Sequence, residues 1–110
     1  MSEPILLEAA RTRVTVAPGA GGRVAQIEAL HRGTWTSLLH APEDFEAATD
    51  PMSWGSFVMA PWPNRIANGR FSWRDRTFEV PANFGAHAIH GVCFDRPWRV
   101  EATSETTCVL

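Results

Sequence analysis

The sequence contains no lysine, and its ten basic residues are all arginines, spread along the 110 residues without a dense cluster. The formal net charge is -2. A nucleic-acid surface normally carries a basic stripe, so we expect no nucleic-acid partner. Arginine is nevertheless suited to directed recognition, because its planar guanidinium is a rigid hydrogen-bonding fork. The charge pattern therefore favours a small polar ligand.

Cysteine and long apolar runs are also scarce. Cys93 and Cys108 form no CxxC pair, which argues against a zinc knuckle or a redox dithiol, and we expect both to be free, partly buried thiols. The acidic N-terminus carries an apolar run too short for a signal-peptide core. No segment approaches the roughly 18 apolar residues that cross a bilayer. The sequence predicts a cytoplasmic protein with no membrane partner.

What is present predicts a small, packed, mostly β domain with antiparallel sheets. Hydrophobic residues make up 45% of the chain and charged residues 20%, which excludes the composition of disordered proteins. Alternating polarity between turn residues is typical of strands. The acidic segment 41–52 is interpreted as a connection, with room for one helical turn and no assigned chemistry. The expected strands are 13–16, 23–30, 34–39 and 98–101, with a hairpin over 70–80 that buries one aromatic face.

The last residues, 106–110, form a β-prone sequence that ends on two apolar side chains. A terminal apolar strand needs a partner strand or leaves an exposed edge. We therefore expect a chain that is cut inside a sheet.

Arg65 follows Asn64 directly after the rigid segment Pro61-Trp62-Pro63. The prolines restrict the backbone, so an arginine here has little entropy to lose on binding a ligand. The alternative is a surface arginine paired with a carboxylate.

A second cluster is His87-Ala88-Ile89-His90-Gly91. In an extended chain the two histidines face opposite sides, so a shared metal ion would need a turn, and no metal site is expected. Gly91 would allow a ligand to approach the backbone closely.

Tryptophans can stack on sugars or pack in a core. We expect Trp54 and Trp62 to line a pocket and Trp35, Trp73 and Trp98 to lie in the core.

Together these motifs resemble the N-terminal part of the aldose 1-epimerase, or galactose mutarotase, family. The resemblance covers residues 1–110 and implies the N-terminal part of a galactose mutarotase-like β-supersandwich. His87 stands where many relatives have asparagine, and Val92 replaces a frequent second glycine. The matching segments are Gly21-Gly22, Pro61 with Asn64-Arg65-Ile66 and Gly69, Ile89-His90-Gly91, and Trp98-Arg99-Val100.

The resemblance implies an isomerase that interconverts the α and β anomers of a free hexose such as galactose or glucose, without a cofactor. A carboxylate removes the anomeric proton while a histidine protonates the ring oxygen. By the same resemblance Asn64, Arg65 and His90 bind the sugar, whereas the general acid and base are expected beyond Leu110. The 110-residue chain is therefore expected to be inactive alone, with no catalytic residue of its own.

Three alternatives stay open. The first is a non-catalytic carbohydrate-binding module that uses the same Arg65 and His90 surface. The second is a hexose-phosphate epimerase in which Arg70, Arg74 or Arg76 faces a phosphate. The third is a cupin-like metal protein that uses His87 and His90. The oligomeric state is not predicted.

Overall fold

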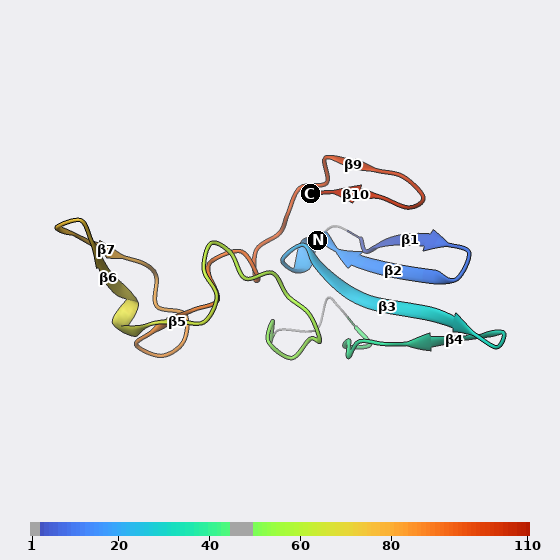
Figure 1. Cartoon of the computed structure of the whole chain (residues 1–110), viewed down its shortest axis with the longest axis horizontal. Coiled ribbons are helices and arrows are strands. Elements are labelled where there is room, and N and C mark those ends of the chain that lie inside the picture. Colours follow the sequence, from blue (N-terminus) through green and yellow to red (C-terminus); the bar gives the residue numbers. More distant parts are fainter. Residues whose placement is uncertain (1–2, 45–49) are drawn as a thin grey trace. The chain divides into compact units, whose positions relative to one another are not determined.

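The computed structural model describes residues 3–44 and 50–110. The chain divides into two compact units, Met1–Val58 with Phe94–Leu110, and Met59–Cys93. The paired strands of the described residues run antiparallel, which confirms the predicted fold class (Figure 1). Within that part of the chain no helix has the length and apolar character needed to cross a membrane. Segment 41–52 was predicted to have room for one helical turn: its described residues, 41–44 and 50–52, contain no helix, and 45–49 lie outside the described residues.

The first unit is built on a four-stranded sheet in the order β1-β2-β3-β4. Its strands are β1 (Ile5–Ala9), β2 (Thr12–Ala17), β3 (Arg23–His31) and β4 (Thr34–Ser37). The last three confirm the predicted strands at 13–16, 23–30 and 34–39. β1 was not predicted, because three successive apolar residues hide the period of two that marks a half-buried strand.

A small core lies at a β-bulge between β2 and β3. The register of the two strands shifts between Thr15 and Val16, and Ala17 and Ala25 are buried there with Trp54. Trp54 is only 5% exposed. The prediction that Trp54 lines a pocket is therefore wrong, since its indole fills the core of this unit.

Arg23 is the most deeply placed charge of this unit, with 1% of the residue exposed. Its guanidinium donates hydrogen bonds to three backbone carbonyls, and it lies over the ring of Trp54 at 4.6 Å. Burial lowers the pKa of Arg23, while the negative charge of Asp95 opposes that shift. The side chain thus joins three segments that are distant in sequence. The acceptors are the carbonyls of Ala20 (2.5 Å), Pro51 (2.6 Å) and Phe94 (2.6 Å).

A two-stranded hairpin, β9 (Ala102–Thr103) with β10 (Cys108–Val109), completes the first unit. Its turn meets β1, where the N–H of Glu8 donates to the carbonyl of Glu105 over 2.8 Å. The strand predicted over 98–101 is wrong. The N–H of Trp98 donates instead to the carbonyl of Pro18, in the 3-10 turn η1 (Pro18–Ala20), and pairing with β10 begins only at Glu101.

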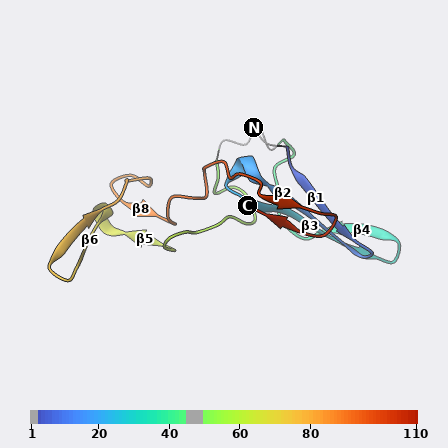
Figure 2. The ribbon, with the colours of Figure 1, turned by 90° about the horizontal axis from the view of Figure 1, so that it is seen from above.

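The second unit contains the other two strand pairs. One joins β5 (Arg65–Ile66) to β8 (Ala88–Ile89), as Figure 2 shows from above. The short turn η2 (Ala67–Gly69) leads from β5 into the hairpin of β6 (Arg70–Trp73) and β7 (Arg76–Glu79). This pair confirms the hairpin predicted over 70–80.

The aromatic face of that hairpin is not buried, contrary to prediction. Trp73 is 62% exposed and Phe71 43% exposed. Their contacts come from the hairpin itself, since Phe71 stacks on Phe78 with ring centroids 5.2 Å apart and Arg74 lies over Trp73 at 5.3 Å. Two strands alone cannot enclose one of their own faces, so the period-two pattern predicted the pairing but not the burial.

Candidate sugar-binding site

The pair β5 and β8 forms the centre of the candidate site. Arg65 lies opposite Ile89, and Ile66 lies opposite Ala88. Both β8 residues are buried. The other edge of β8 is occupied by the side chain of Asn83, which accepts the N–H of Ile89 (2.7 Å) and donates to the carbonyls of Ile89 (3.0 Å) and Gly91 (3.2 Å). Hydrogen bonds therefore hold β8 on both edges, which gives the residues around it a fixed frame.

Asn64 and His90 bond to each other reciprocally at one end of this pair. The backbone N–H of Asn64 donates to Nδ1 of His90 over 2.9 Å, and the N–H of His90 donates to the carbonyl of Asn64 over 2.9 Å. Both residues have left-handed backbones, with φ of 59° and 58°. Because Nδ1 accepts a hydrogen bond, the neutral imidazole carries its proton on Nε2 and is a donor there.

At the other end His87 also accepts a backbone N–H at Nδ1, from Asn68, but its own N–H donates to the carbonyl of Phe84. The N–H of Asn68, whose φ is 56°, donates to Nδ1 of His87 over 2.9 Å. The prediction of two histidines facing opposite sides assumed an extended chain, but the strand is limited to Ala88–Ile89 and His90 turns into the left-handed region. Both rings consequently contact segment 64–68.

Arg65 is held by an aromatic ring rather than by an acid. Its guanidinium carbon lies 5.1 Å from the ring centroid of Phe84, which is 44% exposed. Ion pairs in the described residues involve other arginines, so the expected alternative of an arginine neutralised by a carboxylate is not found there. The side chain oxygen of Asn64 accepts the N–H of Arg65 over 2.8 Å and fixes the start of β5. Stacking on a ring orients the fork and leaves its charge available to a polar ligand.

Gly91 follows His90 with a φ of 75°. A Cβ atom there would lie 1.9 Å from the carbonyl oxygen of Ala60, and the N–H of Val92 donates to the same oxygen over 2.8 Å. We expected a ligand to approach the backbone of Gly91 closely, but the carbonyl of Ala60 occupies that position. Glycine is needed here for chain packing, which sets the position of His90 next to it.

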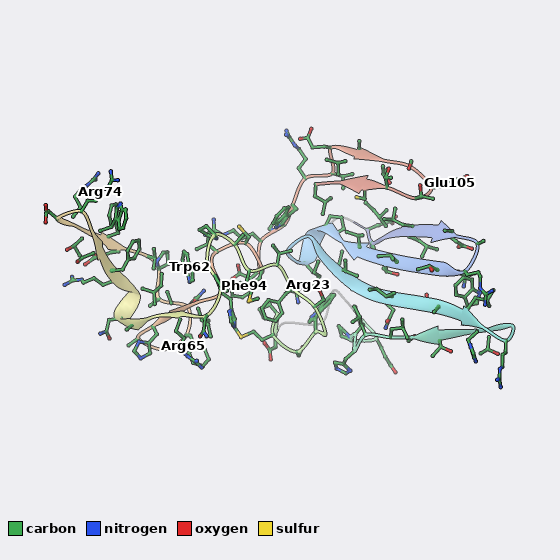
Figure 3. The ribbon with its side chains drawn as sticks, in the orientation of Figure 1. Arg23, Trp62, Arg65, Arg74, Phe94 and Glu105 are labelled. Carbon is green, nitrogen blue, oxygen red and sulfur yellow. The ribbon has the colours of Figure 1, made fainter. Side chains whose placement is uncertain are left out.

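Trp62 lies in the same unit and is half-buried. Its indole nitrogen is buried and has no acceptor among the described residues. Figure 3 marks Trp62 and Arg65 within this unit. The pocket-lining role of Trp62 remains a prediction.

An open groove of about 620 Å³ lies beside η2 and the hairpin. Arg70 forms an ion pair with Glu79 in its wall. The two other arginines of the hairpin lie over rings, Arg74 over Trp73 at 5.3 Å and Arg76 over Phe78 at 5.1 Å. Among residues 3–44 and 50–110 no group of three or more histidine, cysteine or acidic side chains could hold a metal ion.

Sequence reasoning missed the residues that support the motif. Asn68, Asn83 and Phe84 are not among the residues that were selected from the sequence. Their roles depend on contacts with β8 and Arg65, which are distant in sequence. The available signal was the residue type of Asn68 and Asn83, because after glycine asparagine is among the residues that most readily take left-handed or turn conformations.

Comparison with known proteins supports one family. The aldose 1-epimerase family model matches residues 4–110. The uncharacterized protein YihR of Escherichia coli K12 is 31% identical over 101 residues, which are 90% of this chain and 29% of that protein.

Two solved structures share the fold. A candidate aldose 1-epimerase of Escherichia coli K12 matches with a TM-score of 0.75 at 23% identity, over 94% of this chain and 33% of that one. A galactose mutarotase-like protein of Clostridium acetobutylicum matches with a TM-score of 0.71 at 27% identity, over 90% and 30%. The chain therefore spans about a third of the length of these relatives. With a family model that matches it from residue 4 to residue 110, the chain belongs to the aldose 1-epimerase family.

Proposed function

We propose that this chain supplies the sugar-positioning part of an aldose 1-epimerase that interconverts the α and β anomers of a free hexose such as galactose or glucose. Asn64, Arg65 and His90 bind the sugar. One observation carries the proposal: the reciprocal bonds between Asn64 and His90 fix an imidazole donor next to an arginine that has no acidic partner among the described residues.

The three residues offer complementary chemistry to a sugar. The guanidinium fork, the Nε2–H of His90 and the amide N–H groups of Asn64 are all donors, and hydroxyl and ring oxygens have lone pairs to accept from them. Anomer exchange needs a base at the anomeric hydroxyl and an acid at the ring oxygen. Residues held by backbone hydrogen bonds can orient the hexose toward such groups without further ordering cost.

The groups that move protons belong, on this proposal, to the two thirds of the family's length that these 110 residues do not cover. The chain alone should then bind a hexose without accelerating its mutarotation. The half-buried side chains of Cys93 and Cys108 are thiols, as is usual in a reducing compartment, and this supports a cytoplasmic location.

A neutral hexose is favoured over a hexose phosphate. Arg70 is paired with Glu79, and Arg74 and Arg76 belong to the hairpin of β6 and β7, which is a separate strand pair from β5 and β8. Figure 3 places Arg74 at the tip of that hairpin, away from Arg65. Arg65 also lies over a ring, but it belongs to the strand pair whose end carries the bonds between Asn64 and His90.

The test is a titration of the 110-residue chain with galactose, glucose and glucose 6-phosphate, followed by NMR, with polarimetry of anomer equilibration in parallel. We expect binding of the neutral sugars that weakens at least about tenfold in Arg65→Ala, and no change in Arg96→Ala, an exposed arginine of the other unit. Equal binding by Arg65→Ala and the parent would refute the site. Rapid equilibration that is lost in His90→Ala would refute the claim of inactivity.

A further inference from the structure

Like His90, His87 accepts a backbone N–H at Nδ1, but it has no place in the proposed site so far. Its Nδ1 accepts the N–H of Asn68, so the neutral ring carries its proton on Nε2. That Nε2–H has no hydrogen-bond acceptor within the part of the chain that the structure describes. The half-buried ring is thus a fixed donor whose orientation is set by the backbone.

The side chain of His87 lies on the same side as the ring that carries Arg65. His87 and Phe84 form an antiparallel bridge and exchange both backbone hydrogen bonds, of 2.9 and 3.0 Å. Residues paired in this way project their side chains to the same face. The guanidinium of Arg65 lies over the Phe84 ring, so Phe84 links the histidine donor to the arginine fork.

The register of β5 and β8 leads to the same placement. Arg65 lies opposite Ile89, and alternate residues of an extended chain share a face, which puts residue 87 on the face of residue 89. Arg65 and His87 are then diagonal neighbours across the strand pair, a spacing that long side chains can bridge. Two independent backbone pairings therefore bring both donors to one side of β8.

We infer that His87 is a specificity-determining residue of the sugar site, and that its Nε2–H donates to one hydroxyl of a hexose bound against Arg65 and Phe84. This inference rests on the proposed function. A donor fixed in place favours the hexose whose hydroxyl has the matching configuration. An epimer that points this hydroxyl elsewhere leaves the donor unpaired, which is how buried polar groups discriminate between similar substrates.

The decisive variant is His87→Asn. An asparagine Oδ1 is attached at the same position as Nδ1 and can still accept the N–H of Asn68, but asparagine has no atom that corresponds to Nε2. The matched variant His87→Gln has an amide nitrogen near the position of Nε2 and loses the Nδ1 acceptor instead. Comparing the two separates the donor from the structural contact.

The experiment titrates the parent 110-residue chain and both variants with galactose, glucose and a series of singly deoxygenated galactoses, using NMR shifts. We expect His87→Asn to bind one of the two hexoses about 5- to 10-fold more weakly, and to bind one particular deoxy sugar as well as the parent does. His87→Gln should recover part of the loss. The Nε2–H resonance of His87 in the parent should shift when the preferred hexose is added.

The outcomes are distinguishable. If His87→Asn binds every sugar like the parent while Arg65→Ala and His90→Asn lose affinity, the inference is wrong and the proposed function stands. If all variants bind alike, the proposed site fails, and the inference fails with it. Should His87→Asn not fold, an unchanged Nε2–H resonance of His87 in the sugar-bound parent would by itself refute the inference.

Discussion

The N–H of Asn64 donates to Nδ1 of His90, and the N–H of His90 donates to the carbonyl of Asn64, each over 2.9 Å. The two bonds close a ring of contacts at the end of the β5–β8 pair. They use the left-handed backbone of both residues. The imidazole is therefore oriented by main-chain groups, and its side chain need not be ordered again when a ligand binds.

This relationship predicts the tautomer of His90. We expect the Nε2–H form of the neutral ring, visible as the characteristic pair of 15N shifts in a long-range NMR correlation at pH 8. His90→Asn should keep the fold, because Oδ1 can accept the Asn64 N–H and asparagine tolerates the φ of 58°. An Nδ1–H tautomer in the parent would contradict the reciprocal bond.

Removing the ring beneath Arg65 should weaken sugar binding without unfolding the unit. The Phe84 ring is 44% exposed and lies against the guanidinium of Arg65. Phe84→Ala therefore removes the contact that orients this guanidinium, at a stability cost of about 1 kcal/mol or less. We expect hexose affinity to fall about 3- to 5-fold in an NMR titration.

The matched control is Phe71→Ala, since Phe71 is 43% exposed and stacks on Phe78 in the hairpin instead. Its affinity for the hexose should equal that of the parent. Equal losses in the two variants would mean that the Phe84 ring has no special relation to Arg65.

Gly91 should tolerate no side chain. An added Cβ would lie 1.9 Å from the Ala60 oxygen at a φ of 75°, so Gly91→Ala should lower the free energy of unfolding by more than about 4 kcal/mol, or prevent folding. Gly85→Ala is the control, because Gly85 also has a positive φ but nothing within 4 Å of its Cβ position. Its cost should be only about 1–2 kcal/mol. Urea unfolding followed by circular dichroism measures both, and equal values would contradict the packing argument.

The sequence predicted the elements whose signal is local. β2, β3 and the hairpin of β6 and β7 were predicted because alternating polarity between turn residues identifies strands. The strand at 98–101 was wrong because the N–H of Trp98 finds its acceptor at Pro18, eighty residues earlier. The burial of Phe71 and Trp73 was wrong for a related reason, since burial depends on what covers a face and not on the pattern of the strand.

The site was predicted only as a set of residues. Asn64, Arg65 and His90 were selected through the resemblance, and the structure brings them together at the end of β5 and β8. Their geometry depends on positive φ at Asn64, Asn68 and His90, a conformation that asparagine and histidine adopt more often than other non-glycine residues but that the residue type alone does not fix. It also depends on Asn83 and Phe84, which act through contacts that only the folded chain creates.

Arg23 should be essential to the first unit although it takes no part in the proposed chemistry. The guanidinium of Arg23 is buried and donates hydrogen bonds to three backbone carbonyls, and Arg23→Met removes all three bonds. We therefore expect the free energy of unfolding to fall by about 3 kcal/mol. Arg96→Met, at an exposed position of the same unit, should change it by less than about 0.5 kcal/mol. An unchanged free energy of unfolding in Arg23→Met would contradict this prediction and show that apolar packing compensates for the lost hydrogen bonds.

Trp62→Phe should be neutral or stabilising, which is unusual for the truncation of a half-buried aromatic residue. The indole N–H is buried without an acceptor among the described residues, and such a donor costs about 1–3 kcal/mol that phenylalanine would not incur. The smaller ring gives up part of this gain through lost packing. We expect an unfolding free energy equal to that of the parent or up to about 1 kcal/mol higher.

Trp35→Phe provides the contrast in the other unit. Trp35 is half-buried, and the Arg13 guanidinium lies 3.9 Å from its ring centroid, so phenylalanine should weaken the contact and lower stability by about 0.5–1 kcal/mol. Opposite signs for the two substitutions, measured by urea unfolding, would attribute the Trp62 effect to its unpaired N–H. A clear loss of stability in Trp62→Phe would contradict the prediction, because it would mean that the unpaired N–H costs less than the packing that the indole provides.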